Sequence, residues 1–596
     1  MPSFLITDVG STTTKAILIE EINGEYRLVD RAESPTTVEE PFEDVNIGVR
    51  NAIQSLEKIL DRKLEGEKTL TVEGIDYYTS SSAGGGLQVL VIGLYSKITA
   101  ASANRAALGA GAILLDTIST DDVRPIYEKI DALRQARPDM ILLTGGIDGG
   151  SVDFTLEFAD IINSSDPKPR FGDDMKLPVI YAGNKDAADL VKDTLSSNYD
   201  LHVVPNLRPT MNDENLSPAR DQIHELFLSH VMQQAPGYKQ LSDAAVADIV
   251  PTPKAVGNIM TILAKRENLN ILGTDIGGAT TDIFSVIDEK FNRTVSANMG
   301  MSYSIGNVLE QVGLENVKRW LPFEIDDTKL SDMIATKMLF PTTLPVSLKE
   351  LLIEQAVARE ALRISVNHHR DLITALPKKG SAKDFLKTEE QKVKEFTKTE
   401  TLLEMSRIGL IIGSGGVLSH APRREQAALM LLDSAEYIGK TELAVDSIFM
   451  MPHLGVLSQH YPDIALEVLL KDCFIPLGSA ISGKGELKEK DWAVTIKGVI
   501  GTNDVNDKIK AGKLVFYDLE EDEKALITVV PSGKVDVGQG SGKEAKYEVT
   551  GGKSGLVIDM RNTLSNKEFT QEQLIDWLIE SRSFTAEEIE SVRREE

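Results

Sequence analysis

The sequence contains a single cysteine, Cys473, among its 596 residues. One thiol cannot build a disulfide framework, and it cannot supply a cysteine-rich zinc site or an iron–sulfur cluster from this chain alone. The chain also lacks an apolar run of about 18 residues, the length that crosses a bilayer. Its start, Met1-Pro2-Ser3, carries neither the basic nor the long apolar segment of a signal peptide. We therefore expect a cytoplasmic protein with no membrane span.

Positive charge is also scarce, because 64 Lys and Arg stand against 91 Asp and Glu, a net charge of −27. Such a chain is poorly suited to bind nucleic acid or an anionic membrane through its overall field. The hydrophobic content of 42% and the charged content of 26% are those of an ordinary globular protein. A chain of this length exceeds a single core, so three or four domains are expected, on the order of one per 150 residues.

The most informative stretch is residues 274–282, TDIGGATTD, which lies between two short apolar runs. This pattern predicts a strand, a tight turn and a second strand. Glycine allows the backbone N–H groups of the turn to approach a phosphate closely. Asp275, at the end of a buried strand, is costly unless it is solvated, paired or bound to a metal ion. Taken alone, the stretch fits an ordinary glycine-containing hairpin equally well.

The N-terminal segment 4–19, FLITDVGSTTTKAILI, repeats this plan. Aligning Thr7 with Thr274 pairs Asp8 with Asp275, Gly10 with Gly277, Thr13 with Thr280 and Thr14 with Thr281. A second pair of motifs follows, LLTGGID at 142–148 and IIGSGGVL at 411–418. Asp8 and Thr144 are 136 residues apart, and Asp275 and Ser414 are 139 residues apart. We interpret this as an internal duplication of an α/β half.

The rest of the chain predicts the following organisation. Helical spacing covers 45–64, an Ala-rich helix is expected over 98–118, and alternating strands and helices after 140 indicate a mostly parallel or mixed sheet. Short β-rich runs over 484–560 predict a small all-β domain, and capping boxes at Thr570 and Thr585 predict a pair of terminal helices. The expected domains are 1–265, with an inserted subdomain, 266–483, 484–562 and 563–596.

Two such hairpins facing each other across a cleft could clamp a polyphosphate. Asp8 and Asp275 could hold Mg²⁺ directly or through water. The glycine turn at 413–416 could let a nucleoside lie against bare backbone. The candidate nucleotide-binding residues are the turn, hydroxyl and cationic positions of the three motifs, namely Gly10, Ser11, Thr12, Thr13, Lys15, Gly277, Gly278, Ala279, Thr280, Gly413, Ser414, Gly415, Gly416 and Val417.

Other patterns in the sequence are weaker indications of function. The Ser/Gly run at 80–86 fits either a ligand loop or a flexible turn, and the Lys-rich region 378–398 is expected to be a surface excursion. The glycine-rich segment 533–542 does not match the phosphate-loop pattern and is expected to form turns. Adjacent His368 and His369 would point to different sides of a helix, so no metal pair is expected there.

The order DVGSTTTK, DIGGATTD and IIGSGGV resembles the actin, Hsp70 and sugar-kinase ATPase superfamily, over roughly residues 1–480. The resemblance implies a duplicated ribonuclease-H-like core that binds ATP or ADP with Mg²⁺. It also implies that Asp8 and Asp275 are the Mg²⁺-binding and water-orienting carboxylates. The plain TGG turn at 144–146 departs from the superfamily pattern, so its role stays open.

Within that superfamily the sequence is similar to the glutamate mutase L family. The stretches that carry this resemblance are TDVGSTTTKA at 7–16, LLTGGIDGG at 142–150, TDIGGATTDIFSV at 274–286, NMGMSYSIGNV at 298–308 and IIGSGGVLSHAP at 411–422. The family implies an ATP-dependent chaperone or reactivase that serves the subunits of an adenosylcobalamin-dependent glutamate mutase or a related aminomutase.

Four alternatives remain at this point. A small-molecule kinase would share the core, but no motif marks its catalytic base or substrate pocket. An actin-like filament-forming ATPase would polymerise with ATP. An activator of 2-hydroxyacyl-CoA dehydratases needs a cluster held by cysteines, which one cysteine disfavours. A degenerate core that hydrolyses nothing is disfavoured by the two intact Asp hairpins. The sequence leaves open whether the chain forms a homo-oligomer.

Overall fold

The computed structural model describes residues 2–594 apart from 11–12, 39–40, 67–69, 83–86, 171–174, 212, 228–235, 374–400 and 567. The chain divides into two units. The first comprises Met1–Ile262, Leu372–Leu402 and Met451–Asp472, and the second comprises Leu263–Asp371, Leu403–Met450 and Cys473–Glu596. Within the described ranges, no helix combines the length and the apolar character that a membrane crossing requires. The Lys-rich region expected at the surface, 378–398, lies outside the described residues.

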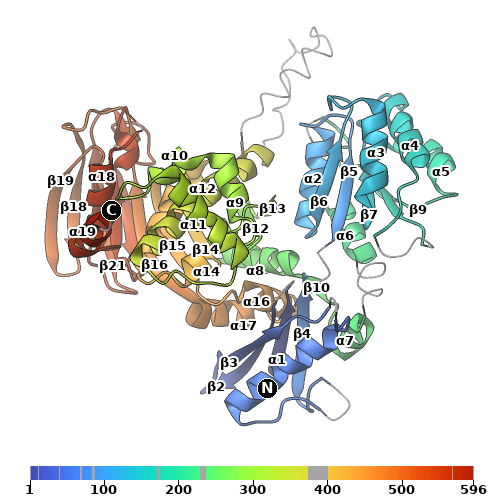
Figure 1. The fold of residues 1–596 in the computed structure, drawn as a ribbon, viewed down its shortest axis with the longest axis horizontal. Coiled ribbons are helices and arrows are strands. Elements are labelled where there is room, and N and C mark those ends of the chain that lie inside the picture. Colours follow the sequence, from blue (N-terminus) through green and yellow to red (C-terminus); the bar gives the residue numbers. More distant parts are fainter. Residues whose placement is uncertain are drawn as a thin grey trace, which may run out of the picture. The chain divides into compact units, whose positions relative to one another are not determined.

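The first unit contains a five-stranded sheet in the order β10-β4-β1-β2-β3 (Figure 1). Strands β1 to β3 form an antiparallel meander, and β4 runs parallel to β1. The predicted helix is α1 (Val45–Leu60), which packs on β2 and β3 and starts at Asp44, whose side chain accepts a bond from the Asn46 amide. The strands are β1 (Ser3–Val9), β2 (Thr13–Ile22), β3 (Glu25–Pro35), β4 (Ile75–Ser81) and β10 (Val250–Pro251).

A second, fully parallel sheet follows in the same unit, in the order β6-β5-β7-β8-β9. Its strands β7 and β8 are short, apolar and buried, as MILL and PVIY, because helices cover a parallel sheet on both faces. The strands are β5 (Gln88–Ile92), β6 (Ile113–Ile118), β7 (Met140–Leu143), β8 (Pro178–Tyr181) and β9 (Asp200–Val203). The helices between and after them are α2 (Thr99–Gly109), α3 (Ile126–Ala136), α4 (Asp153–Ser165), α5 (Ala188–Leu195) and α6 (Ser217–Leu226).

The expected helix over 98–118 is correct only in its first half. The helix ends at Gly109, and Gly111 has a φ of +95°, a conformation that breaks the helix before β6. A short apolar run such as Ile113–Ile118 does not by itself distinguish a helix from a buried strand.

The second unit contains an eight-stranded sheet in the order β13-β12-β11-β14-β15-β16-β24-β20. Strands β11 to β13 form an antiparallel meander, β14 runs parallel to β11, and β15 runs parallel to β14. Counted along the chain, the five strands of the first sheet and the first five strands of this sheet both have the order third, second, first, fourth, fifth. This repeat confirms the predicted duplicated ribonuclease-H-like core. The strands are β11 (Asn270–Ile276), β12 (Thr280–Ile287), β13 (Lys290–Ala297), β14 (Ile408–Ser414), β15 (Gly439–Asp446) and β16 (Phe474–Ser482).

Helices connect and cover the strands of these two sheets. In the second unit they are α9 (Ile305–Val312), α10 (Leu314–Lys318), α11 (Asp327–Leu339), α12 (Leu348–Leu372), α14 (Gly416–Ser419) and α15 (Arg424–Asp433). The first unit also holds α7 (Tyr238–Ala244), α16 (Met451–Leu457) and α17 (Pro462–Val468), and α8 (Thr252–Glu267) begins in it.

The tail forms the expected small β sheet, in the order β19-β18-β21-β23, but not all of its strands stay in that sheet. β24 pairs in parallel with β16, and β20 pairs with β24, so both extend the large sheet of the second unit. The predicted capping boxes start α18 (Gln571–Glu580) and α19 (Ala586–Arg594). The tail strands are β17 (Lys484–Gly485), β18 (Trp492–Ile500), β19 (Asn503–Lys510), β20 (Leu514–Tyr517), β21 (Lys524–Pro531), β22 (Val535–Asp536), β23 (Ala545–Thr550) and β24 (Leu556–Asp559).

The second pair of repeated motifs was matched wrongly. β7, which leads to Thr144, belongs to the parallel sheet β6-β5-β7-β8-β9, whereas β14 belongs to the ribonuclease-H-like sheet. The counterpart of β14 in the first unit is β4, because each pairs in parallel with the first strand of its meander. The similar spacing of the TGG and GSGG turns is therefore a coincidence, while the duplication of the hairpins stands.

Candidate functional site

The turn of the first hairpin is closed by a backbone hydrogen bond from the Gly10 amide to the Thr13 carbonyl, at 3.0 Å. A Cβ atom added to Gly10 would lie 2.7 Å from that oxygen, so a side chain does not fit there. Asp8 is paired across the hairpin with Lys15. Ser11 and Thr12, two of the predicted ligand residues, lie outside the described residues. The turn therefore places a carboxylate and an ammonium group next to each other at its base.

Asp8 is 4% exposed and is held by two hydroxyl groups. Its Oδ1 atom accepts a hydrogen bond from Ser80 Oγ at 2.7 Å and another from Thr252 Oγ1 at 2.7 Å. Both bonds go to the same oxygen, Oδ1, so within the described part of the chain Oδ2 is the atom of Asp8 that could meet a cation. Mg²⁺ usually takes one or two carboxylates and completes its shell with water and phosphate. The described residues contain no cluster of three acidic, His or Cys side chains, so a Mg²⁺ ion here would rely on phosphate and water.

Hydroxyl groups continue beneath Asp8 as a buried network. Thr7 Oγ1 lies 2.6 Å from Tyr77 Oη and donates to Thr79 Oγ1 at 2.8 Å. Ser81 Oγ lies 2.8 Å from the Tyr238 hydroxyl. Burial raises the pKa of Tyr77 to about 12, so this phenol stays protonated at neutral pH. Each of these hydroxyl groups therefore has a hydrogen-bond partner.

His453, on α16, is fully buried in the first unit. Burial lowers the pKa of its imidazole to about 4, against the negative charge of Asp8, which acts to raise it, while Lys15 acts to lower it. The imidazole is therefore neutral at pH 7. Its electrostatic coupling to both charged residues of the hairpin places it at the base of the candidate site.

The second hairpin has the same turn, closed by the Gly277 amide and the Thr280 carbonyl at 2.9 Å. Asp275 is paired across the hairpin with Asp282, in the position that Lys15 occupies in the first hairpin. Arg293 compensates the Asp282 carboxylate with an ion pair of 2.6 Å.

The segment after β13 donates hydrogen bonds to the carbonyl groups of this turn. The amides of Met301 and Ser302 donate to the carbonyls of Gly277 and Gly278, each at 2.9 Å, and Ser304 Oγ donates to the Ala279 carbonyl at 2.6 Å. Among the described residues, no hydrogen bond uses the amides of Gly278 and Ala279. The turn therefore offers two free N–H groups, the feature that binds phosphate oxygens.

The end of β14 lies beside this hairpin, with Ser414 opposite Asp275 in the parallel pairing. Gly415 has a φ of +96°, and a Cβ atom there would lie 2.2 Å from the Ile276 carbonyl oxygen. A Cβ atom on Gly416, in contrast, would meet nothing within 4 Å. The GSGG turn is therefore fixed against β11 at Gly415 and open at Gly416, where short helix α14, which includes Val417, begins.

The predicted residues fall into two sets, one in each unit. Asp8, Gly10, Thr13 and Lys15 come together in the first unit. The second unit brings Asp275 and the turn 277–280 beside the segment 413–417. Each set contains one carboxylate at a strand end, a glycine turn and at least one hydroxyl group.

The Thr144–Gly150 turn, whose role the sequence left open, is held within its own domain. Thr144 Oγ1 donates to the Ala182 carbonyl at 3.0 Å, and Asp148 accepts bonds from the Lys185 amide and the Asn206 side chain. The Gly149 amide donates to Asp186 at 3.0 Å. These bonds give the turn a structural role at the ends of the parallel strands.

The two adjacent histidines behave as the helix geometry predicts. His369 is fully buried, and its ring nitrogens lie 3.0 Å from Thr294 Oγ1 and 2.9 Å from Ser285 Oγ. His368 is exposed on α12. Burial lowers the pKa of His369 to about 3, so it is a neutral part of the core of the second unit.

Sequence reasoning missed Ser80, Thr252 and His453, which surround Asp8. Ser80 carried a partial signal, because the Ser/Gly run that begins there was considered as a ligand loop. Thr252 and His453 carried none, since they lie 244 residues or more from Asp8 along the chain.

Comparison with known proteins connects these motifs to a family. A family model for the MutL protein matches residues 4–473. Protein MutL of Clostridium tetanomorphum is 26% identical over 508 residues, which cover 79% of this chain and 99% of that protein.

Solved structures with related folds match more weakly. They include nucleotide-free acetone carboxylase (TM-score 0.32, 11% identity, 76% of this chain and 70% of that chain) and component A of (R)-2-hydroxyglutaryl-CoA dehydratase from Acidaminococcus fermentans (TM-score 0.25, 9% identity, 78% and 100%). A diol dehydratase-reactivating factor in nucleotide-free form also matches (TM-score 0.28, 10% identity, 78% and 100%). TM-scores this low support no functional assignment. The family model, in contrast, spans most of the chain, which therefore belongs to the MutL protein family, the glutamate mutase L family that its motifs resemble.

Proposed function

We propose that this protein binds and hydrolyses Mg-ATP and uses the hydrolysis to reactivate an adenosylcobalamin-dependent glutamate mutase or a related aminomutase. Membership of the MutL protein family supports an accessory role. The specific partner subunits and the coupling to hydrolysis are our proposal.

One observation carries the nucleotide part of the proposal. The two hairpins have the same turn, closed by the same amide-to-carbonyl bond at 3.0 and 2.9 Å, and each places an aspartate opposite a serine of the next parallel strand. A glycine turn with unused amides beside a carboxylate suits a polyphosphate with its metal ion. Repetition of the closing bond and of the aspartate–serine pairing in both units favours a shared function over an ordinary hairpin.

The residues would have distinct roles in this reaction. Asp8 and Asp275 would hold Mg²⁺, directly or through water, and Lys15 would add positive charge toward the phosphates. The free amides of Gly278 and Ala279 would bind phosphate oxygens. Mg²⁺ would supply charge neutralisation on the phosphates. The open backbone at Gly416 would leave room for the nucleoside.

The test measures Mg-ATP hydrolysis by the full chain, alone and with an aminomutase that turnover has inactivated. We expect hydrolysis together with recovery of mutase activity when fresh adenosylcobalamin is added. Asp8→Asn and Asp275→Asn should lose both, while Asp518→Asn, a change at a surface carboxylate that is 77% exposed, should lose neither. Hydrolysis without any effect on a mutase would refute the accessory role and favour a kinase or filament-forming ATPase.

A further inference from the structure

A cavity of about 690 Å³ lies in the second unit, outside the hairpins. It is lined by the C-terminal part of α12, by residues 404–406 before β14, by residues 432–436 and 438 at and after the end of α15, and by tail residues that include Arg561, Phe569 and Trp577. None of the predicted nucleotide residues is among these lining residues. Its volume is within the range of pockets for small molecules, roughly 300–1,000 Å³.

One wall of the cavity consists of hydrogen-bond donors. Arg363, Asn367 and Arg370 all line it, and their spacing of four and then three residues places them on one face of α12. Arg319, which follows α10, joins them. Arginine presents five N–H groups in a fixed planar fork, a geometry that suits carboxylate and phosphate.

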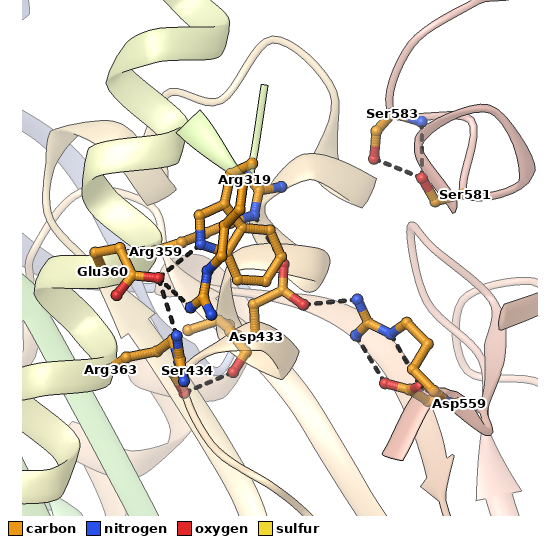
Figure 2. A network of polar contacts seen from close by, with 12 residues as sticks. Arg319, Arg359, Glu360, Arg363, Asp433, Ser434, Asp559, Ser581 and Ser583 are labelled. Atoms are coloured by element: carbon orange, nitrogen blue, oxygen red, sulfur yellow. Dashed lines mark hydrogen bonds and ion pairs between the residues drawn. The ribbon is translucent and has the colours of Figure 1, made fainter. Parts of the chain in front are cut away.

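Two of these arginines share a single countercharge. Figure 2 shows Arg319 and Arg363 converging on Glu360, whose Oε1 atom accepts from both guanidinium groups and from the Trp320 indole at 2.7 Å. Two positive charges against one carboxylate leave an excess of one. The Nε atom of Arg319 is buried and has no hydrogen-bond partner among the described residues. The Arg363 side chain stays 36% exposed.

The neighbouring charges, in contrast, are paired. Asp433 lies between Arg359 and Arg561, at 2.7 Å from each, and Arg561 also binds Asp559 at 2.7 Å (Figure 2). The two arginines and two aspartates of this buried group therefore balance each other in charge. Three further carboxylates line the cavity: Glu436 forms an ion pair with Lys484 at 3.2 Å, and Glu404 and Glu568 are exposed to solvent. Hydration weakens their influence, so the arginine wall keeps its excess charge.

Aromatic rings hold the arginine wall in place. Trp320, Phe569 and Trp577 form a row with ring centroids 5.1 and 5.0 Å apart, and the Arg319 guanidinium lies 5.0 Å from the Trp320 ring. The Trp577 indole N–H donates to the Gly512 carbonyl at 2.9 Å, so this ring is fixed as well. Donors fixed before binding lose little conformational entropy when a ligand arrives.

We propose that this cavity is a second ligand site, which binds a small organic anion through a carboxylate or phosphate group held by Arg363 and Arg319. The site is independent of the proposed nucleotide hairpins.

Titration of the full-length protein with citrate and with pyrophosphate tests the proposal, by calorimetry and by tryptophan fluorescence. Two of the three tryptophans, Trp320 and Trp577, line the cavity, and Trp492 lies in β18. We expect binding with a fluorescence change. Arg363→Gln should weaken it about tenfold, the effect of losing a charge-assisted hydrogen bond. Glu404→Gln should strengthen it about threefold, because it removes a repulsive charge.

Arg582→Gln is the matched control, since Arg582 is a surface arginine of the same unit that does not line the cavity. This variant should change the affinity for neither citrate nor pyrophosphate. Tighter binding of citrate would identify carboxylate as the ligand group, and tighter binding of pyrophosphate would identify phosphate. The proposal is overturned if neither probe binds at 10 mM, if Arg363→Gln behaves like Arg582→Gln, or if Asp275→Asn abolishes the binding. The last result would assign the anion to the hairpin.

Discussion

The two hairpins share a backbone but differ in what surrounds their carboxylates. In the first, Ser80 Oγ donates to Asp8, and Thr7 Oγ1 bonds to Tyr77 and Thr79. At the same positions of the second, Ser414 Oγ and Thr274 Oγ1 are buried without a hydrogen-bond partner among the described residues.

A buried polar group without a partner costs free energy, so its presence calls for an explanation such as an unfilled role. The hydroxyl groups around the first carboxylate are all hydrogen-bonded and fix it in advance, although both ring nitrogens of the nearby His453 are buried without a hydrogen-bond partner among the described residues. The second hairpin keeps unsatisfied hydroxyl groups beside its carboxylate. Duplication preserved the turn, and the two surroundings then diverged.

The largest expected effect concerns the carboxylates themselves. Asp8→Asn and Asp275→Asn should each reduce Mg-ATP hydrolysis about 1000-fold, because each removes a negative charge that holds the metal ion. Steady-state turnover measures this. Equal losses would mean that both hairpins still act in the reaction. A loss confined to one variant would mean that the other hairpin has only a structural function.

The GSGG turn offers a matched pair of variants. Gly415→Ala should destabilise the second unit by about 3 kcal/mol, because its Cβ would collide with the Ile276 carbonyl and its φ is +96°. Gly416→Ala has open space and should change stability by less than about 0.5 kcal/mol. Denaturant unfolding measures both. Similar values for the two variants would contradict the close contact at Gly415.

The buried histidine of the first unit predicts a pH dependence. The folded-state pKa of His453 is about 4, below the usual 6.5, so the unfolded state binds a proton first as the pH falls. Its contribution to stability is complete above pH 6.5 and is lost between 6.5 and 4. The wild-type protein should therefore lose about 2 kcal/mol more than His453→Gln between pH 7 and pH 5. Parallel pH profiles of the two proteins would mean that folding does not lower the pKa of His453.

The smallest expected effect compares the equivalent serines of the two hairpins, Ser80 and Ser414. Ser80→Ala should cost about 1.5 kcal/mol, because it removes a hydrogen bond to a buried carboxylate. Ser414→Ala should cost nothing measurable without ligand, because the hydroxyl it removes has no partner. Thermal unfolding of the ligand-free variants tests this. An equal cost at both serines would mean that the second hairpin is as complete as the first.

The sequence was sufficient to predict the hairpins because their determinants are local. A strand, a glycine turn and a second strand lie within about 15 residues, and the repeat of Asp8 and Gly10 at Asp275 and Gly277 carried the duplication. The terminal helices were equally local, since each starts at its own capping box.

The surroundings of Asp8 could not be predicted in this way. Ser80, Thr252 and His453 come from a neighbouring strand and two helices, and no short motif connects them to Asp8. For the same reason the TGG turn was matched to the wrong strand. Spacing along the chain does not reveal which sheet a strand joins, and here a whole parallel sheet had been inserted between β4 and β10.

The position of β24 has a consequence for biosynthesis. This strand, Leu556–Asp559, covers the edge of β16, and among the described strands β20 pairs with β24 alone. During translation, β16 emerges long before β24, so the growing chain exposes an open strand edge until β24 has been made. Open edges template aggregation. Termination of translation between β16 and β24 would therefore leave this edge open, and the need for a folding helper should be greatest until β24 emerges.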